Sequence, residues 1–178
     1  MQILSLSLRV VAGLILLGVA TGVSAEKSSL TATIPYEGEG RVFQVTPDTM
    51  LFMGDYEGIM YVETAEGELD QAFVRCPAIQ KVNLKTKVLS GYGYCVIAVS
   101  EGNTVYAEWT CEGDPSGCRG EFTLTAGTGE FEGIKGSSKL LVRSPLHALL
   151  ADMATGSVVT TEAGLVVLPK LSYEIPNR

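Results

Sequence analysis

Beyond residue 25, the sequence is a succession of short segments rich in valine, threonine, tyrosine, phenylalanine and isoleucine. These residues favour β-strands, and short strands at even spacing are typical of an all-β barrel or sandwich. Turn formers separate the segments: Pro47-Asp48, Glu66-Gly67, Glu101-Gly102-Asn103 and Asp114-Pro115. Only SPLHALLADM, residues 144–153, has apolar residues at helical spacing, and it allows at most one short helix. We therefore predict one all-β domain over residues 26–178.

The first 25 residues have the three-part layout of a secretory signal peptide. Arg9 precedes the apolar run VVAGLILLGVA, and small residues follow at Val23 and Ala25, so we expect cleavage after Ala25. The run is shorter than the roughly 20 apolar residues that span a bilayer, and an uncleaved anchor is the alternative. The mature protein is expected to be secreted or periplasmic, without membrane attachment.

The charge of the chain argues against two classes of partner. The formal net charge is −7, and removing Arg9 with the signal peptide makes it −8. A negatively charged protein repels the phosphates of nucleic acids and of anionic lipids, so neither is expected as a partner.

Four cysteines, at positions 76, 95, 111 and 118, indicate disulfides in an exported chain. EGDPSG lies between Cys111 and Cys118 and is a turn sequence, so these two cysteines should close the base of a hairpin. Zinc sites favour cysteines about two to four residues apart and often include histidine. Here 18, 15 and six residues intervene and the chain has one histidine, so no metal site is expected.

The other two cysteines fall opposite each other in an upstream hairpin. VNLKTKVL reverses at Lys85-Thr86, and a two-residue turn there places Cys76 opposite Cys95. Opposed residues of antiparallel strands lie about 4.5 to 5.5 Å apart at Cα, within disulfide range. We predict the pairs Cys76–Cys95 and Cys111–Cys118, although Pro77 could shift the first register by one residue.

The same alternation assigns faces to the central strands. A three-residue turn at 101–103 would place Cys95 opposite Trp109, which should then be buried beside the Cys76–Cys95 bridge. The face predicted to be buried consists of Val74, Cys76, Val82, Leu84, Cys95, Ile97, Val99, Ala107 and Trp109. The opposite face carries Phe73, Arg75, Tyr92, Tyr94, Val96, Tyr106 and Glu108.

Four aromatic residues are unusual on a solvent-facing surface, so the second face is expected to pack on a second sheet, a subunit or a ligand. Its candidate ligand-binding or interface residues are Arg75, Tyr92, Tyr94, Tyr106 and Glu108. If the face lines a cavity, these become binding or acid–base groups. If it meets a subunit they are interface residues, which we favour because the other face already supplies a core.

The segment AGTGEFEGIKGSS, residues 126–138, is rich in glycine but lacks the features of a phosphate loop. The Walker and dinucleotide-binding spacings are both missing, a strand follows, and Glu130 and Glu132 would repel a phosphate. No nucleotide or other cofactor is expected. We predict a structural turn instead, in which the first two glycines allow positive φ and the last two allow a bend or bulge. In chain order these glycines are Gly127, Gly129, Gly133 and Gly136.

This segment resembles the GGTGxFxGaxG motif of dirigent proteins and allene oxide cyclases, with GEFTLT before it and KLLV after it. The order GYGYC, hairpin, tryptophan strand, cysteine and glycine segment also resembles exported bacterial proteins of the allene oxide cyclase barrel-like superfamily. The resemblance covers about residues 91–143 clearly and 40–168 loosely. It implies an eight-stranded antiparallel β-barrel with an apolar interior, commonly a homodimer or homotrimer. No catalytic residue of the plant enzymes can be matched by position.

Other candidate chemistry is weakly supported. His147 is the only histidine and has no local carboxylate and nucleophile with which to form a triad. Of the acids available as a glycosidase pair, which are Glu63, Glu108, Glu130 and Glu132, only Glu108 shares a face with tyrosines.

Three functions are compatible with the sequence. The first is a secreted or periplasmic, disulfide-bonded barrel that binds a small apolar molecule in its interior. The second is an isomerase or cyclase of the allene oxide cyclase or dirigent type, which steers a reactive substrate by confinement. The third is a structural or protein-interaction module that acts through its tyrosine-rich face. A roomy apolar interior would favour the first two, and a side-chain-filled barrel the third.

Overall fold

The computed structural model describes residues 26–63, 69–114, 116–144 and 157–176, which form a closed barrel of eight antiparallel strands. Each strand pairs with the next in sequence, and β1 pairs with β8 to close the barrel. The strands are β1 (Glu26–Thr46), β2 (Thr49–Glu63), β3 (Leu69–Asn83), β4 (Val88–Ser100), β5 (Asn103–Asp114), β6 (Gly117–Gly127), β7 (Lys135–Arg143) and β8 (Ser157–Ile175). The predicted eight-stranded antiparallel barrel is confirmed.

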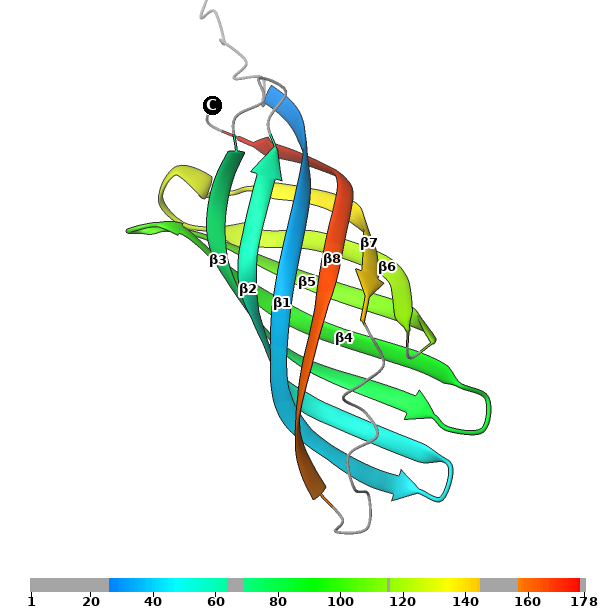
Figure 1. Cartoon of the computed structure of the whole chain (residues 1–178). Coiled ribbons are helices and arrows are strands. Elements are labelled where there is room, and N and C mark those ends of the chain that lie inside the picture. The colour runs from blue at the N-terminus through cyan, green and yellow to red at the C-terminus, as the bar shows by residue number, and fades with distance from the viewer. Residues whose placement is uncertain (1–25, 64–68, 115, 145–156, 177–178) are drawn as a thin grey trace, which may run out of the picture.

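In Figure 1, β1, β2 and β8 run nearly vertically at the front, and β4 to β6 cross behind them at a steep angle. Within the described ranges the only helical element is the 3₁₀ turn η1 (Gly129–Phe131). Three predictions lie outside the described residues: the signal peptide over 1–25, the short helix after Ser144, and the position of His147.

Strand alternation divides the side chains between a packed interior and the outer wall. Along β4, Cys95 and Ile97 point inward and are buried, whereas Tyr94 and Val96 between and beside them are exposed. The core continues around the barrel through Val74, Trp109, Phe122, Leu124, Leu140 and Leu168. A closed barrel has no free sheet edge, so every strand is paired on both sides.

Several interior glycines make room for aromatic rings from neighbouring strands. A Cβ atom at Gly93 would lie 2.7 Å from Trp109 Nε1, and one at Gly38 would lie 2.5 Å from the Tyr56 ring. The GYGY sequence of β4 therefore places tyrosines on the outer wall and leaves space inside for the indole of Trp109. Large rings over glycines fill the barrel without increasing its diameter.

This packing predicts the effect of a single methyl group. Gly93→Ala should lower the free energy of unfolding by about 1–3 kcal/mol, because the added Cβ meets both the indole and the Pro77 carbonyl oxygen. Urea denaturation followed by Trp109 emission measures the change. Ser90→Ala on the same strand is the control, with an expected change within about 0.5 kcal/mol. Equal stability of the Gly93 variant and wild type would contradict this packing.

The register of β3 with β4 is the predicted one, and that of β4 with β5 is not. Cys95 lies opposite Ala107, and Trp109 lies opposite Gly93, two residues from the predicted position. There are two causes, and each shifts the register by one residue. The turn has two residues in place of the predicted three, with Ser100 paired to Asn103, and an irregularity lies between Ala98 and Ser100. Because the shift is an even number of residues, Trp109 still faces inward and is buried.

Two residues predicted to be buried are exposed. Leu84 is 39% exposed and Val99 is 40% exposed. Leu84 follows the end of β3 and Val99 lies at the irregularity near the end of β4, so both are beyond the interior that the alternation pattern describes. Alternation predicts burial in the middle of a strand and fails where the strand leaves the barrel.

Both predicted disulfides are present. Cys76–Cys95 joins β3 to β4 with a Cα–Cα distance of 4.1 Å, and Cys111–Cys118 joins β5 to β6 at 5.6 Å. The second bridge runs diagonally, because Cys111 pairs with Gly120 and Cys118 pairs with Gly113. Each bridge therefore links the two strands of one hairpin.

The glycine-rich segment forms the turn η1 and its connections. Gly129 has the predicted positive φ, +61°, and Gly133, which was predicted to allow a bend or bulge, also has positive φ, +78°. Positive φ favours glycine at both positions. Asn103 Oδ1 accepts a hydrogen bond from the Glu130 backbone N–H at 2.9 Å, which links this turn to the β4–β5 turn.

The first and last glycines of the segment do not have the predicted roles. Gly127 ends β6 without positive φ, and a Cβ there would collide with the Phe131 carbonyl oxygen. Gly136 was predicted to bend or bulge the chain at the turn, but it is a regularly paired residue of β7, and the β7–β8 irregularity comes only after Ser137. A Cβ at Gly136 would lie 2.4 Å from the Ser172 carbonyl oxygen. Close approach of a neighbouring backbone, rather than turn geometry, therefore requires glycine at both positions.

Candidate functional site

The predicted site residues lie together on the outer wall of β3, β4 and β5, and their roles remain predictions. We call this surface the tyrosine face and define it as Phe73, Arg75, Tyr92, Tyr94, Val96, Tyr106 and Glu108. Tyr94 is 61% exposed and Tyr92 is 50% exposed. Cross-strand pairing places Val96 between Arg75 and Tyr106, and places Tyr94 beside Glu108. Within the described chain nothing packs over these side chains.

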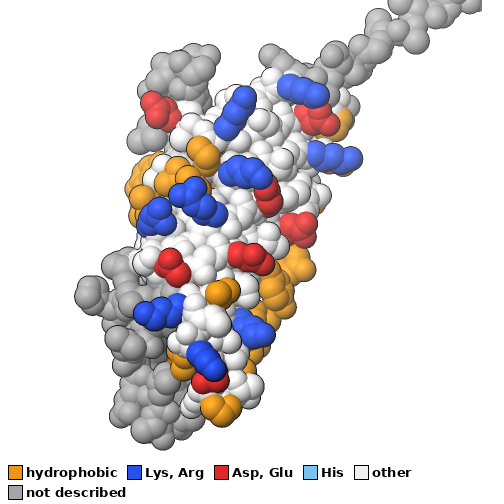
Figure 2. Space-filling model, turned by 90° about the vertical axis from the view of Figure 1, so that its right-hand side faces the viewer, with side chains coloured by type: hydrophobic (Ala, Val, Ile, Leu, Met, Phe, Trp, Pro, Cys, Tyr) orange, Lys and Arg blue, Asp and Glu red, His pale blue; other side chains and the backbone are white. Residues whose placement is uncertain are grey.

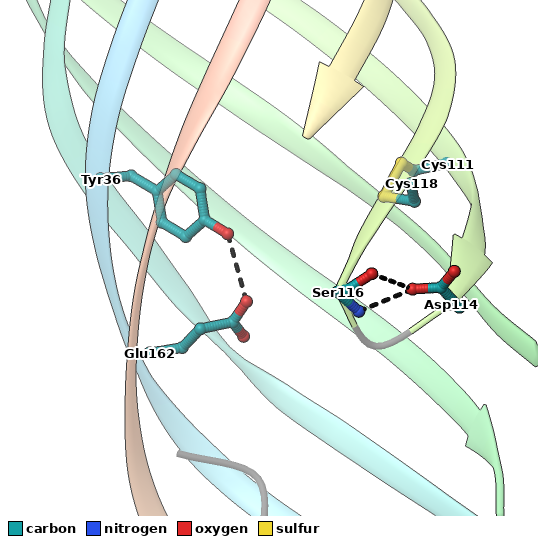
Figure 3. The surroundings of a disulfide bond; sticks show 6 residues. All are labelled: Tyr36, Cys111, Asp114, Ser116, Cys118 and Glu162. Carbon is teal, nitrogen blue, oxygen red and sulfur yellow. Dashed lines mark hydrogen bonds between the residues drawn. A yellow bond between two sulfur atoms is a disulfide. The ribbon is translucent and has the colours of Figure 1, made fainter. Parts of the chain in front are cut away.

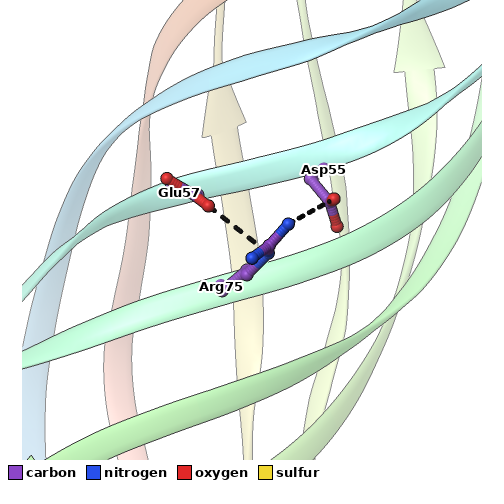
Figure 4. Close-up of polar contacts among 3 residues, drawn as sticks. All are labelled: Asp55, Glu57 and Arg75. Atoms are coloured by element: carbon purple, nitrogen blue, oxygen red, sulfur yellow. Dashed lines mark hydrogen bonds and ion pairs between the residues drawn. The ribbon is translucent and has the colours of Figure 1, made fainter.

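Arg75 at one border of the tyrosine face holds two carboxylates of β2. Its Nη2 donates to Asp55 Oδ2 at 3.0 Å, and its Nε lies 3.3 Å from Glu57 Oε1 (Figure 4). These ion pairs are exposed and raise the pKa of the guanidinium, first through the Asp55 hydrogen bond and then through the charges of both acids. Arg75 therefore keeps its positive charge and a fixed position on the surface.

At the opposite border, a shallow pocket of about 290 Å³ lies between Tyr92 and Tyr94. Its other outward side chains are Glu108, Thr110, Glu121 and Thr123. Glu121 pairs with Lys139, whereas Glu108 has no ion pair within the described residues. On the face drawn in Figure 2, acidic and basic side chains lie close together, with small groups of hydrophobic side chains among them.

Inside the barrel, Tyr36, Tyr56 and Glu162 form a polar cluster that the sequence analysis missed. The Tyr36 hydroxyl donates to Glu162 Oε1 at 3.1 Å (Figure 3). The Tyr56 hydroxyl donates to Glu162 Oε2 at 3.5 Å. All three residues are buried, and the two rings meet edge to face at 5.2 Å between centroids. Burial, followed by the charge of Glu162, raises the pKa of both phenols.

The cluster joins parts of the chain that are far apart in sequence, which is why it was missed. Tyr36 and Glu162 are 126 residues apart and meet only because β1 pairs with β8. One signal was available: Glu162 has the same strand parity as the inward-facing Val166 and Leu168. The alternation of side chains along the strand could therefore have indicated that the Glu162 carboxyl group lies on the buried side of β8.

A small cavity lies at the centre of the barrel, with a volume of about 60 Å³. Its wall is mostly apolar and includes Val74, Phe122, Leu140 and both cysteines of the Cys76–Cys95 bridge. Trp109 also lines it, as expected from its predicted position beside this bridge. Pockets for drug-sized ligands are about 300–1,000 Å³, so side chains fill most of this interior.

Among the described residues, no three histidine, cysteine, aspartate or glutamate side chains are placed to hold a metal ion. The helical content of the described part includes no segment long and apolar enough to cross a membrane. Two disulfides fit a protein that resides outside the cytosol, in an extracellular or periplasmic compartment.

No family model matches the sequence, and no curated protein matches it. Among solved structures, the chain is similar to the pterocarpan synthase dirigent protein GePTS1, with 13% sequence identity and a TM-score of 0.39. The alignment covers 89% of this chain and 98% of that chain. A similarity this low carries no argument about family, residue roles or function, so the resemblance to dirigent proteins and allene oxide cyclases remains a prediction.

Proposed function

We propose that this protein is an exported interaction module, whose tyrosine face pairs with the same face of a second copy to form a homodimer. Signal-peptide cleavage after Ala25 and residence outside the cytosol are part of this proposal. The observation that carries it is the contrast between a filled interior and an exposed aromatic outer wall. The central cavity has about 60 Å³, whereas Tyr92 and Tyr94 are at least half exposed.

The small interior is the reason for preferring this function to the two others. Binding an apolar molecule, or steering a substrate as a cyclase does, needs an enclosed volume of about 300–1,000 Å³ for a ligand of ordinary size. The rings over Gly38 and Gly93 would have to move to provide it. Tyrosine, by contrast, is enriched at protein interfaces because its ring is apolar and its hydroxyl is polar.

The arrangement of charges supports pairing with a second copy. Arg75 lies beside Val96 on the β3 side of the tyrosine face, and Glu108 lies beside Tyr94 on the β5 side. The two charges thus occupy opposite corners around a centre formed by Tyr94 and Val96. A two-fold axis that lies in the interface plane and passes through that centre brings Arg75 of each copy over Glu108 of the other, which is the self-complementarity that a symmetric dimer requires. Asp55 and Glu57 bind the guanidinium through Nη2 and Nε, so Nη1 is the nitrogen that would donate to Glu108.

Charge reversal tests this pairing. Arg75→Glu and Glu108→Arg should each weaken the dimer about 100-fold or more, because each variant places two like-charged pairs in the interface. The double variant should restore the dissociation constant to within about tenfold of wild type, because the pairs reform with reversed sign. Sedimentation equilibrium over a range of concentrations measures all four proteins.

A control variant and a check of folding distinguish loss of the dimer from loss of the fold. Tyr61→Ser removes an exposed tyrosine of β2 outside the tyrosine face and should leave the dissociation constant unchanged. Far-UV circular dichroism verifies that each variant retains its strands. A wild-type protein that stays monomeric at about 100 μM, a concentration well above the dissociation constants of specific dimers, would contradict the proposed dimer. So would a double variant as weak as either single one.

A further inference from the structure

Gln80 is a buried polar side chain that lacks a partner. It points inward from β3, is 8% exposed and lines the central cavity. Within the described chain its side-chain amide makes no hydrogen bond. Buried amides are nearly always hydrogen-bonded, because leaving one unsatisfied costs free energy.

Trp109 brings a second unsatisfied polar group to the same cavity. It is 9% exposed, and its indole N–H has no partner in the described part of the chain. Gly91 lies between Gln80 and the benzo ring of Trp109: a Cβ there would lie 2.9 Å from Gln80 Cγ and 3.4 Å from Trp109 Cζ3. The indole Nε1 lies at the other end of the ring, 2.7 Å from a Cβ placed at Gly93. Gly91 thus leaves room for both side chains at one side of the cavity.

The cavity limits the size and charge of what could satisfy these groups. Its volume of about 60 Å³ is several times the roughly 10–15 Å³ that one water molecule needs and well below the roughly 300 Å³ of the smallest ordinary ligand pockets, so it suits an occupant of about four non-hydrogen atoms. No inward-pointing charged side chain lines it; Glu57, which contributes to the wall, belongs to the outer face of β2. The nearest buried charge, Glu162, lies behind the lining phenols of Tyr36 and Tyr56 and already accepts a hydrogen bond from each of them. A charged occupant would therefore have no direct partner in the cavity, which favours a neutral one.

We propose that this cavity is a binding site for a small neutral molecule that both donates and accepts hydrogen bonds, such as a short amide. Gln80 supplies a carbonyl acceptor and an NH₂ donor, which together match a primary amide. The apolar wall formed by Val74 and Phe122 accommodates a methyl group. This site is inside the barrel and does not depend on the proposed dimer.

Acetamide is the probe for the test, and the single tryptophan is the reporter. Titration of the disulfide-bonded protein with acetamide should give a saturable change in Trp109 emission and a shift of the Gln80 side-chain amide resonance in NMR. A dissociation constant on the order of millimolar is expected for so small a ligand. Benzamide has the same amide group but a ring too large for the cavity, and should give no saturable change.

Matched variants locate the site. Gln80→Leu should weaken acetamide binding at least about tenfold. Gln71→Leu, on the exposed outer side of the same strand, should leave it unchanged. Contacts between the acetamide methyl group and Val74 or Phe122, measured as intermolecular NOEs in wild type, give a readout that needs no variant.

Four results would overturn the proposal: no saturable response in wild type, equal binding of benzamide, unchanged acetamide affinity in a folded Gln80→Leu variant, or NOEs that place acetamide outside the cavity. A long-lived water at the Gln80 amide that saturating acetamide does not displace would also overturn it. That result would make the cavity a structural water site only.

Discussion

Reducing both disulfides should lower the free energy of unfolding by about 5 kcal/mol, the largest effect that we expect from a covalent change. Cys76–Cys95 closes a loop with a sequence separation of 19 and Cys111–Cys118 one of 7. Loop-closure entropy makes such bridges worth about 3 and about 2.5 kcal/mol. Small domains have only about 5–15 kcal/mol in total, so the reduced protein should be close to unfolding.

Urea denaturation of the oxidised protein and of two double variants, Cys76→Ala/Cys95→Ala and Cys111→Ala/Cys118→Ala, separates the two contributions. Removing Cys76–Cys95, which closes the longer loop, should lower the free energy of unfolding more than removing Cys111–Cys118. Trp109 emission gives a second readout, because it lines the same cavity as Cys76 and Cys95 and a disulfide quenches a nearby indole. Reduction without unfolding should therefore brighten the emission. If both double variants are as stable as wild type, the bridges do not hold the barrel together.

Raising the pH from about 10 to about 12 should remove up to about 5 kcal/mol of stability, the second large effect. Tyr36 and Tyr56 have pKa values raised above 10 in the folded protein by burial and by Glu162. Below pH 10 both phenols are protonated in the folded and unfolded chains, so their contribution to stability is complete. Above about pH 10 the unfolded chain releases two protons that the folded chain retains, so stability falls by up to about 2.7 kcal/mol per pH unit.

Urea denaturation at about pH 8, 10, 11 and 12, on both sides of the ordinary tyrosine pKa, measures this slope. The matched variant is Tyr36→Phe/Tyr56→Phe, which keeps both rings and removes both hydroxyls. It should be less stable than wild type at the lowest pH, because Glu162 loses both of its hydrogen-bond donors. Its stability should fall less steeply at high pH, and subtracting its slope removes the contribution of all other groups. Parallel slopes for the two proteins would show that these phenols do not hold their protons in the folded barrel.

Local pattern was enough to predict an all-β barrel or sandwich, both disulfides and the inward or outward direction of most central residues. The choice of an eight-stranded barrel came from the family resemblance. Cys76 and Cys95 could be paired because a short turn fixes the register of the strands on either side. The predicted β4–β5 register was wrong by two residues: the turn has two residues in place of the predicted three, and an irregularity near Val99, which alternation cannot detect, adds the second residue. The inward or outward direction of each side chain was still predicted correctly, because the error is an even number of residues. Trp109 was therefore placed on the buried face.

The glycine segment shows the same limit at a single residue. Positive φ was predicted correctly for Gly129, whereas Gly133 was predicted to allow a bend or bulge and instead has positive φ in the turn. Gly136 has the same side chain but lies in β7, where it is needed because the β8 backbone passes close to it. Sequence alone does not distinguish a glycine that turns the chain from one that admits a neighbouring strand.

The candidate site could be predicted in part because its residues are close in sequence. Tyr92, Tyr94 and Glu108 lie on two neighbouring strands of one hairpin, so sequence alone placed them on one face. The interior cluster around Glu162 depends on closure of β1 against β8, a contact of high sequence separation. The small volume of the interior also could not be predicted, because it follows from rings packing over glycines of neighbouring strands.

The most direct test of a packed barrel that works through its outer wall is native mass spectrometry of the oxidised protein, purified from the compartment to which its source exports it. We predict a homodimer that carries no bound molecule of more than about 100 Da, because the central cavity has about 60 Å³. A monomer with an apolar adduct of several hundred daltons would contradict the account. It would mean that the rings over the interior glycines move aside and that the function lies inside the barrel.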